Sequence, residues 1–177
     1  SEKLWERYQE YADRHFRAEI QHNFHARFWE MYLTCTLLEA GCSVRCKKPG
    51  PDVLIEEGEG RIWLEAVVPS GGNRAKPDTV KESKEGEVHS IPDEKILLRY
   101  RSAIDEKFRK RELYQVKRIV VADDSYVVAL NGCDVPYGWA EPSWPRVLGA
   151  VYPLGPLEIV INTNSMEIVE ERHQHRA

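Results

Sequence analysis

Residues 51–67 read PDVLIEEGEGRIWLEAV, and this stretch decides the fold that we expect for the chain. Two apolar segments flank a Glu-Gly-Glu-Gly turn, a pattern typical of a hairpin of two antiparallel strands. If the turn centres between Gly58 and Glu59, cross-strand partners have numbers that sum to 117, so Asp52 lies opposite Glu65. The same register gives a wholly apolar opposite face, made of Val53, Ile55, Ile62, Leu64 and Ala66.

Two carboxylates therefore share the polar face of the expected hairpin. The Cβ atoms of directly opposed residues lie ~5 Å apart, and like charges at that distance destabilise the fold unless they are neutralised. A divalent cation would neutralise Asp52 and Glu65. The alternative is that both acids are solvated on a polar outer face, or that a different turn shifts the register.

Two helices are predicted before the hairpin. Residues 2 to about 20 carry apolar side chains at helical spacing, and a second helix follows from about residue 22 to 40, with Gly41 as its stop. Glu30 lies on a partly apolar face of the second helix, where a carboxylate is costly unless a cation pairs with it. Glu30 is therefore a third candidate for the site, and the alternative is an ion pair with Arg27 or with another basic residue.

Further strands and one helix complete the expected α/β fold. Residues 69–90 have almost no apolar content and predict a mobile loop or lid, and a helix follows from about Pro92 to about Tyr114. The order of elements indicates one domain over residues 1–177, with segments 1–21, 22–68, 69–90 and 91–177 around a central mixed sheet. The strand candidates are residues 43–47, 52–56, 61–68, 119–122, 126–130, 157–162 and 166–170.

Composition limits the possible classes of protein. The chain has 177 residues, of which 42% are apolar and 31% charged, and its net charge is −4. Its longest unbroken apolar run, residues 126–130, is far too short to span a membrane, and its first residues lack the apolar core of a secretory signal. We therefore expect a cytoplasmic protein that does not bind membranes. Residues 95–118 carry nine basic and three acidic side chains, which indicates a localised basic surface.

The acidic residues resemble a known motif. Glu30 on a leading helix, then Pro51-Asp52, then a hairpin that ends in Leu64-Glu65-Ala66-Val67, is similar to the PD-(D/E)XK, or restriction-endonuclease-like, nuclease superfamily. The resemblance covers residues 24–68 and, more loosely, the chain to Asn131. It implies a central mixed sheet flanked by helices, and Mg²⁺ or Mn²⁺ held by Asp52, Glu65 and the carbonyl of Ala66, often with Glu30. At the position where the superfamily has a lysine, this chain has Val67.

Lys107 is the predicted replacement for that lysine. It falls within the apolar arc of the third helix, where an inward ammonium has to meet carboxylates or phosphate, or else extend to solvent. Arg111 lies on the continuation of this arc and is the second choice. The resemblance implies that this helix packs beside Glu65, so Lys107 is expected to join a catalytic cluster, and the alternative is an ordinary ion pair.

The expected function is a metal-dependent nuclease that hydrolyses phosphodiester bonds, with DNA as its expected substrate rather than RNA. The alternative is a catalytically inactive domain of the same fold that binds nucleic acid or protein, and a homodimer is possible in either case. Exposed Trp139 or Trp144 would stack on bases, but packing of the long loop onto the sheet is the preferred explanation for these side chains. Candidate contacts with the nucleic acid are Lys47, Lys48, Arg74, Lys95, Arg99 and Arg111.

Overall fold

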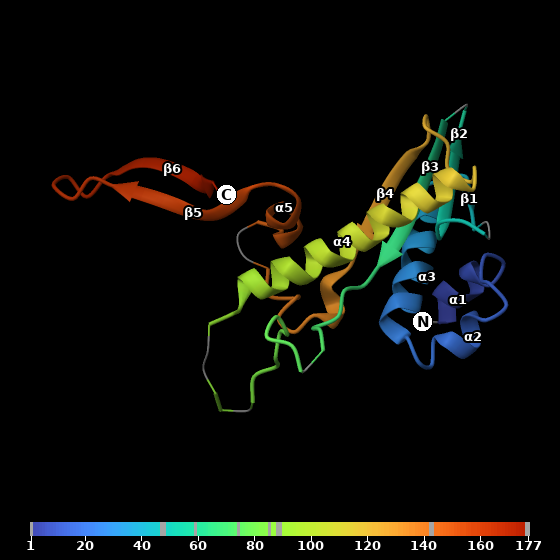
Figure 1. Ribbon diagram of the computed structural model, residues 1–177, viewed down its shortest axis with the longest axis horizontal. Helices are drawn as coiled ribbons and strands as arrows, with labels where there is room; N and C mark the ends of the chain where they lie inside the picture. Colours follow the sequence, from blue (N-terminus) through green and yellow to red (C-terminus); the bar gives the residue numbers. More distant parts are fainter. Residues whose placement is uncertain are drawn as a thin grey trace.

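The computed structural model describes residues 2–46, 49–58, 60–73, 75–84, 86–87, 90–141 and 144–175. Within these residues the chain forms a mixed α/β fold around a four-stranded sheet, with the strand order β1-β2-β3-β4 (Figure 1). The first three strands are antiparallel neighbours, and β4 runs parallel to β3. The strands are β1 (Val44–Arg45), β2 (Val53–Glu57), β3 (Gly60–Val67) and β4 (Ser125–Leu130).

The predicted hairpin register is confirmed. Val53 pairs with Leu64 and Leu54 with Trp63, so partner numbers sum to 117 and Asp52 precedes β2 at the level of Glu65. The expectation that only one face is core is wrong, because apolar side chains on both faces of the hairpin are buried. Successive side chains of the two strands point to opposite faces, so they contribute to a separate hydrophobic core on each side of the sheet.

Two long helices cover the two faces of the sheet (Figure 1). Helix α3 (Phe24–Glu39) packs Leu33 and Leu37 against the face of Val53 and Leu64. Helix α4 (Asp93–Val116) crosses the other face, where Tyr114 packs against the cluster that contains Trp63. Both helices match their predicted ranges closely, because each shows an apolar stripe with a clear start and stop. Gly41 has the positive φ of 82° that ends α3.

The predicted single helix over residues 2–20 is broken. The structure has α1 (Glu2–Tyr8) and a short α2 (Phe16–Glu19), separated by a turn in which the Asp13 side chain accepts a hydrogen bond from the backbone N–H of His15. The break lets Tyr8 and Phe16 pack against each other with their rings 4.8 Å apart. Both residues are fully buried, so burial of aromatic surface outweighs continuation of the helix.

Two other expectations, for residues 119–122 and 69–90, are corrected. The predicted strand over residues 119–122 is an irregular segment, in which Val120 is buried beside Trp63. The low-apolar segment 69–90 is partly packed, because Thr79 and Val80 are buried against the α4 side of the molecule. The loop after β4 contains a 3₁₀ turn, η1 (Gly132–Asp134), and helix α5 (Arg146–Val151).

The last two strands are separate from the central sheet. Strands β5 (Leu154–Ile161) and β6 (Ile168–His175) pair antiparallel with each other as a two-stranded ribbon (Figure 1). The central sheet of the structure is therefore smaller than the sequence predicted, because β5 and β6 do not join it. Among the helices of the described chain, none combines the length and apolar character that a membrane span requires.

Candidate metal and phosphate site

The hairpin register places two carboxylates beside each other at the start of β2 and the middle of β3. Glu65 is buried, with 2% of its surface exposed, and Asp52 is partly buried. One Asp52 oxygen accepts a hydrogen bond from the backbone N–H of Ala66 at 2.8 Å. That bond fixes the Asp52 side chain to the residue that follows Glu65, so both acids belong to one site.

Two lysines of α4 reach the same oxygen of Glu65. Lys107 Nζ lies 3.0 Å and Lys110 Nζ 3.2 Å from Glu65 Oε1. The Lys107 side chain is 15% exposed and that of Lys110 is 39% exposed, so Lys107 is the inner of the two. This contact fits both the expected cluster and the alternative of an ordinary ion pair, so a catalytic role for Lys107 stays a prediction.

The second oxygen of Glu65 differs from the first. Glu65 Oε2 is buried and has no hydrogen-bond partner among the described residues. Arg111 Nε, one helical turn after Lys107, is also buried and also has no hydrogen-bond partner among the described residues. Buried polar atoms are nearly always satisfied, so this oxygen needs a partner such as the nearby Tyr114 phenol, a water or a cation.

Tyrosines surround the carboxylates and stay neutral. Burial, followed by the negative charge of Glu65, raises the pKa of the Tyr114 phenol and that of the Tyr126 phenol. Tyr126 Oη donates to the backbone carbonyl of Lys107 at 3.1 Å, which ties β4 to the middle of α4. Burial by itself disfavours the ammonium of Lys110, but a hydrogen bond with the Lys107 side chain, followed by the charge of Glu65 and the hydrogen bond with it, outweighs that cost and raises the pKa of Lys110.

The donor set fits Mg²⁺. This ion takes hard oxygen ligands, commonly one or two carboxylates together with water and substrate phosphate. Asp52 and the unpartnered Oε2 of Glu65 supply two such groups, and the Ala66 carbonyl is a third oxygen in the same strand. In the part of the chain that the structure describes, no group of three or more His, Cys, Asp or Glu side chains is placed to hold a metal ion. The fit is therefore to a two-carboxylate site.

The partners of Glu30 include residues of α1 and α3. It is buried on α3, accepts a hydrogen bond from Tyr8 Oη at 3.1 Å and pairs with Arg27 at 2.6 Å. The ion pair with Arg27 is the alternative that the sequence left open. Within the described residues, Glu30 does not join Asp52 and Glu65 in a metal-binding group of three.

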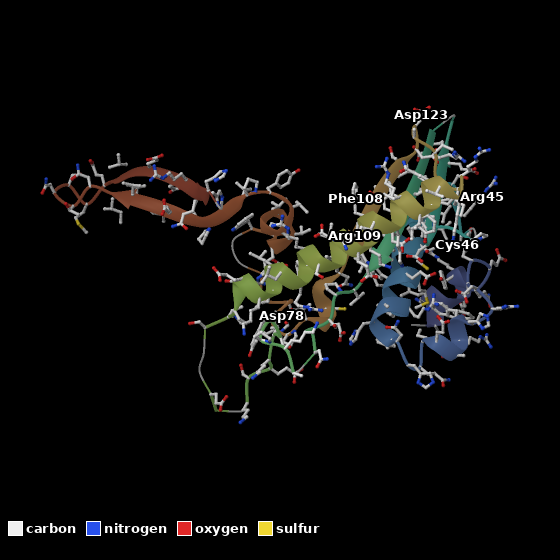
Figure 2. The ribbon with its side chains drawn as sticks, viewed as in Figure 1. Arg45, Cys46, Asp78, Phe108, Arg109 and Asp123 are labelled. Carbon is white, nitrogen blue, oxygen red and sulfur yellow. The ribbon has the colours of Figure 1, made fainter. Side chains whose placement is uncertain are left out.

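The predicted contacts with nucleic acid are spread over several surfaces. Lys47, Lys48 and Arg74 lie outside the described residues. Lys95 is exposed on α4, whereas Arg99 donates to the Ser70 carbonyl at 3.0 Å and pairs with Asp78 at 3.4 Å. Arg99 therefore holds the segment after β3 against α4, and Figure 2 shows Asp78 beneath the first half of that helix. Arg111 is partly buried on the inner side of α4.

The two tryptophans considered for base stacking differ from each other. Trp139 is 84% exposed, whereas the partly buried Trp144 packs on His173 with ring centroids 5.0 Å apart. The packing alternative therefore holds for Trp144. Trp139 keeps a free ring, so stacking on a base stays a prediction for this residue alone.

Sequence reasoning missed two parts of the site. Lys110 follows Lys107 by one helical turn, and that spacing could have placed it on the same face. Tyr126 lies two strands from Asp52, and nothing in its local sequence predicts its bond to α4. Comparison of the chain with family models, with curated proteins and with solved structures found no match.

Proposed function

We propose that the chain is a metal-dependent nuclease whose site is formed by Asp52, Glu65, Lys107 and Lys110. The observation that carries the proposal is the asymmetry of Glu65, in which Oε1 receives two ammonium groups while the buried Oε2 has no partner within the described chain. A buried carboxylate oxygen needs a partner, and a bound metal ion would supply one for Oε2.

The chemistry assigned to each residue follows from its surroundings. Mg²⁺, when bound, would polarise a phosphoryl oxygen and lower the pKa of an attacking water. Asp52 and Glu65 would hold the ion through carboxylate oxygens. The raised pKa of Lys110 keeps that side chain as an ammonium, so its role is electrostatic rather than that of a general base. Lys107 lies deeper and would donate to the phosphate or the attacking water.

The fold also supports a restriction-endonuclease-like architecture, which we include in the proposal. Three antiparallel strands, a long crossover helix and a parallel fourth strand place α4 directly over Glu65. This arrangement is similar to the restriction-endonuclease-like architecture, in which the catalytic lysine lies on the strand of the glutamate. Here the helix supplies the lysines, which would compensate for Val67.

A second candidate function is a catalytically inactive module that binds nucleic acid. Val67 and the ion pairs of Lys107 and Lys110 with Glu65 favour it, because two ammonium groups already balance the carboxylate without a metal ion. Both candidates predict affinity for nucleic acid. Only the first predicts hydrolysis.

The experiment is a cleavage assay on plasmid DNA and on single-stranded DNA and RNA oligonucleotides. We expect the protein to cut DNA with Mg²⁺ or Mn²⁺ and to stop when EDTA is added. Glu65→Gln and Asp52→Asn should abolish cleavage, whereas Glu57→Gln, an exposed change on the same hairpin, should leave it unchanged. Equal cleavage by the wild type and Glu65→Gln after identical purification would contradict the proposal, and binding without cleavage would establish the second candidate.

A further inference from the structure

Cys133 is the one exposed residue among the four cysteines of the chain. Cys35 is buried, and Cys42 and Cys46 are partly buried. Cys133 lies in η1, the turn that follows β4, and it lines a cavity of about 490 Å³. A thiol has to be accessible to react with a molecule from solution, so Cys133 is the candidate for thiol chemistry.

The turn holds Cys133 in a defined position. The Asn131 side chain accepts a hydrogen bond from the backbone N–H of Cys133 at 3.0 Å, and Val135 is buried just after the turn. Gly132 lies so close to α4 that a Cβ atom there would overlap the hydroxyl of Tyr100. The backbone that carries the thiol is therefore anchored on both sides.

Helix α3 brings a histidine to this thiol. Trp29 Nε1 donates to the Ala129 carbonyl at 2.9 Å, which ties α3 to the end of β4. His25 lies one helical turn before Trp29, and its Nδ1 is 3.6 Å from Cys133 Sγ, a hydrogen-bond contact for a sulfur atom. The two residues are 108 positions apart in the chain, so the tertiary fold creates this pair.

Asp134 extends the pair to a row of three groups. Its Oδ1 lies 3.6 Å from His25 Nε2, so the imidazole faces a carboxylate with one nitrogen and the thiol with the other. A carboxylate favours the tautomer that carries hydrogen on the nitrogen facing it. That tautomer leaves Nδ1 of His25 as an acceptor for the proton of Cys133.

The surroundings of Cys133 keep its sulfur protonated at rest. Partial burial, followed by the negative charge of Asp134, raises the pKa of the Cys133 thiol. Reaction of this sulfur therefore needs a base that removes the proton as the sulfur attacks, and His25 is in position to do so. Once formed, a thiolate with a raised pKa is intrinsically the stronger nucleophile.

The cavity beside Cys133 has aromatic and aliphatic walls. They are formed by Trp29, Tyr100, Leu130, Trp139 and Val147. The carboxylate of Glu141 also lines the cavity, but it accepts a hydrogen bond from the backbone N–H of Arg146 at 2.9 Å and lies 4.0 Å from its guanidinium. A cavity of this size and lining takes a small organic group, and its aromatic walls favour a flat ring.

We propose that Cys133 is a nucleophilic thiol, that His25 is its base, and that it forms mixed disulfides with small aromatic disulfides that enter this cavity. The proton of Cys133 passes to His25 Nδ1 while the sulfur attacks one sulfur of the disulfide. A new S–S bond forms as the old one breaks, and the leaving sulfur takes the electron pair and the proton from His25. Asp134 orients the imidazole.

The electrons of this exchange balance without a further reactant. Cys133 is oxidised to the disulfide level, and the sulfur that leaves is reduced to a thiol. The inference does not depend on the proposed nuclease activity, because none of the three residues belongs to the Asp52 and Glu65 site.

Reaction of the folded full-length protein with excess dithiodipyridine at pH 7 tests the proposal. Release of thiopyridone is followed by its absorbance. One thiol should react ahead of the other three, and Cys133→Ser should remove this fast phase. His25→Ala should slow it about tenfold, because an ordinary thiol is only a few per cent thiolate at pH 7. Added imidazole should restore part of the rate, and His22→Ala, a change of another exposed histidine, should react as the wild type does.

Two further variants test the orienting residue and the cavity. Asp134→Asn should slow the wild type but should not slow the His25→Ala protein, because this carboxylate acts through the histidine. Trp139→Ala should slow the reaction with dithiodipyridine while alkylation of Cys133 by iodoacetamide, which has no ring, stays unchanged. Far-UV circular dichroism confirms that each variant is folded.

Several results would overturn the proposal. A Cys133 thiol that reacts no faster than the other cysteines would exclude it as an activated nucleophile. A His25→Ala protein that reacts at the wild-type rate, or that imidazole does not rescue, would exclude His25 as the base. Equal slowing of both reagents by Trp139→Ala would exclude the cavity as the binding site for the aromatic ring.

Discussion

The buried carboxylate of Glu65 is balanced by cations of the protein itself. The sequence suggested that Asp52 and Glu65 would repel each other unless a metal ion lay between them. The structure shows that Lys107 and Lys110 both contact Glu65 on one oxygen, so crowding of like charge is already relieved before any metal binds. Removal of the Glu65 carboxylate is therefore not expected to stabilise the metal-free protein.

The first prediction concerns the stability of the metal-free protein. Glu65→Gln should lower the free energy of unfolding by about 1–3 kcal/mol, because it leaves two partly buried ammonium groups without their counter-charge. Urea unfolding in EDTA measures the change. A variant as stable as the wild type would show that the lysines do not depend on Glu65.

The second prediction separates the two lysines. Lys107→Met should reduce any cleavage turnover by at least ~100-fold, because it removes the deeper positive charge next to the carboxylates. Lys110→Met should have a smaller effect, since that side chain is more exposed. Turnover is measured with saturating substrate for both variants. An unchanged turnover for Lys107→Met would remove this residue from the site.

The third prediction concerns acid stability. Asp124 is buried and accepts hydrogen bonds from the Val121 backbone, Trp63 and Arg61, each at 2.9 Å. Burial alone would raise the pKa of Asp124, but these bonds outweigh it and lower the pKa below its ordinary value. A lowered pKa stabilises the fold above the unfolded pKa of about 4, and this stabilisation is lost as the pH falls towards the folded value.

Unfolding of Asp124→Asn across this pH range tests the third prediction. The variant should be less stable at pH 7 by about 1–3 kcal/mol and should lose less further stability in acid than the wild type. Asp123→Asn is the matched control. Asp123 precedes Asp124 in the chain, and its side chain is exposed at the tip of the sheet, where Figure 2 labels it. Parallel acid-unfolding curves for the wild type and Asp124→Asn would contradict the account.

At the scale of elements, the sequence predicted best where local pattern and tertiary packing agree. The hairpin follows from its turn residues and its alternation, and α3 and α4 follow from apolar stripes with clear ends. The break between α1 and α2 depends on contact between Tyr8 and Phe16, which helical spacing cannot show. Similarly, Val120 is buried in a bend without joining the sheet, so composition alone mistakes its segment for a strand.

The fourth prediction tests how closely η1 packs on α4. A Cβ atom at Gly132 would overlap the hydroxyl of Tyr100 and lie 2.7 Å from its Cζ, and Tyr100 is buried on α4. Gly132→Ala should therefore destabilise the protein by about 1–3 kcal/mol, as measured by urea unfolding. Gly60→Ala is the control, since its Cβ would meet only the Glu57 carbonyl at 3.4 Å. Equal stability of the two variants would contradict close packing at η1.

At the scale of the whole molecule, the sheet and α4 form the candidate site while the ribbon of β5 and β6 lies apart from it (Figure 1). The separation of β5 and β6 from the central sheet could not be predicted, because a hairpin pattern does not show whether its strands join other strands. The hairpin register predicted that Asp52 and Glu65 lie together, and the resemblance to the nuclease superfamily, rather than the chain order, suggested that Lys107 would lie beside Glu65.

Direct measurement of Mn²⁺ binding tests the central claim, which is that Asp52 and Glu65 form a metal site. Isothermal titration should give one bound ion per chain for the wild type, displaced by excess Mg²⁺. Asp52→Asn and Glu65→Gln should lose this binding, whereas Glu57→Gln should keep it. A wild type that binds no Mn²⁺, or two site variants that bind it as tightly as the wild type, would contradict the account.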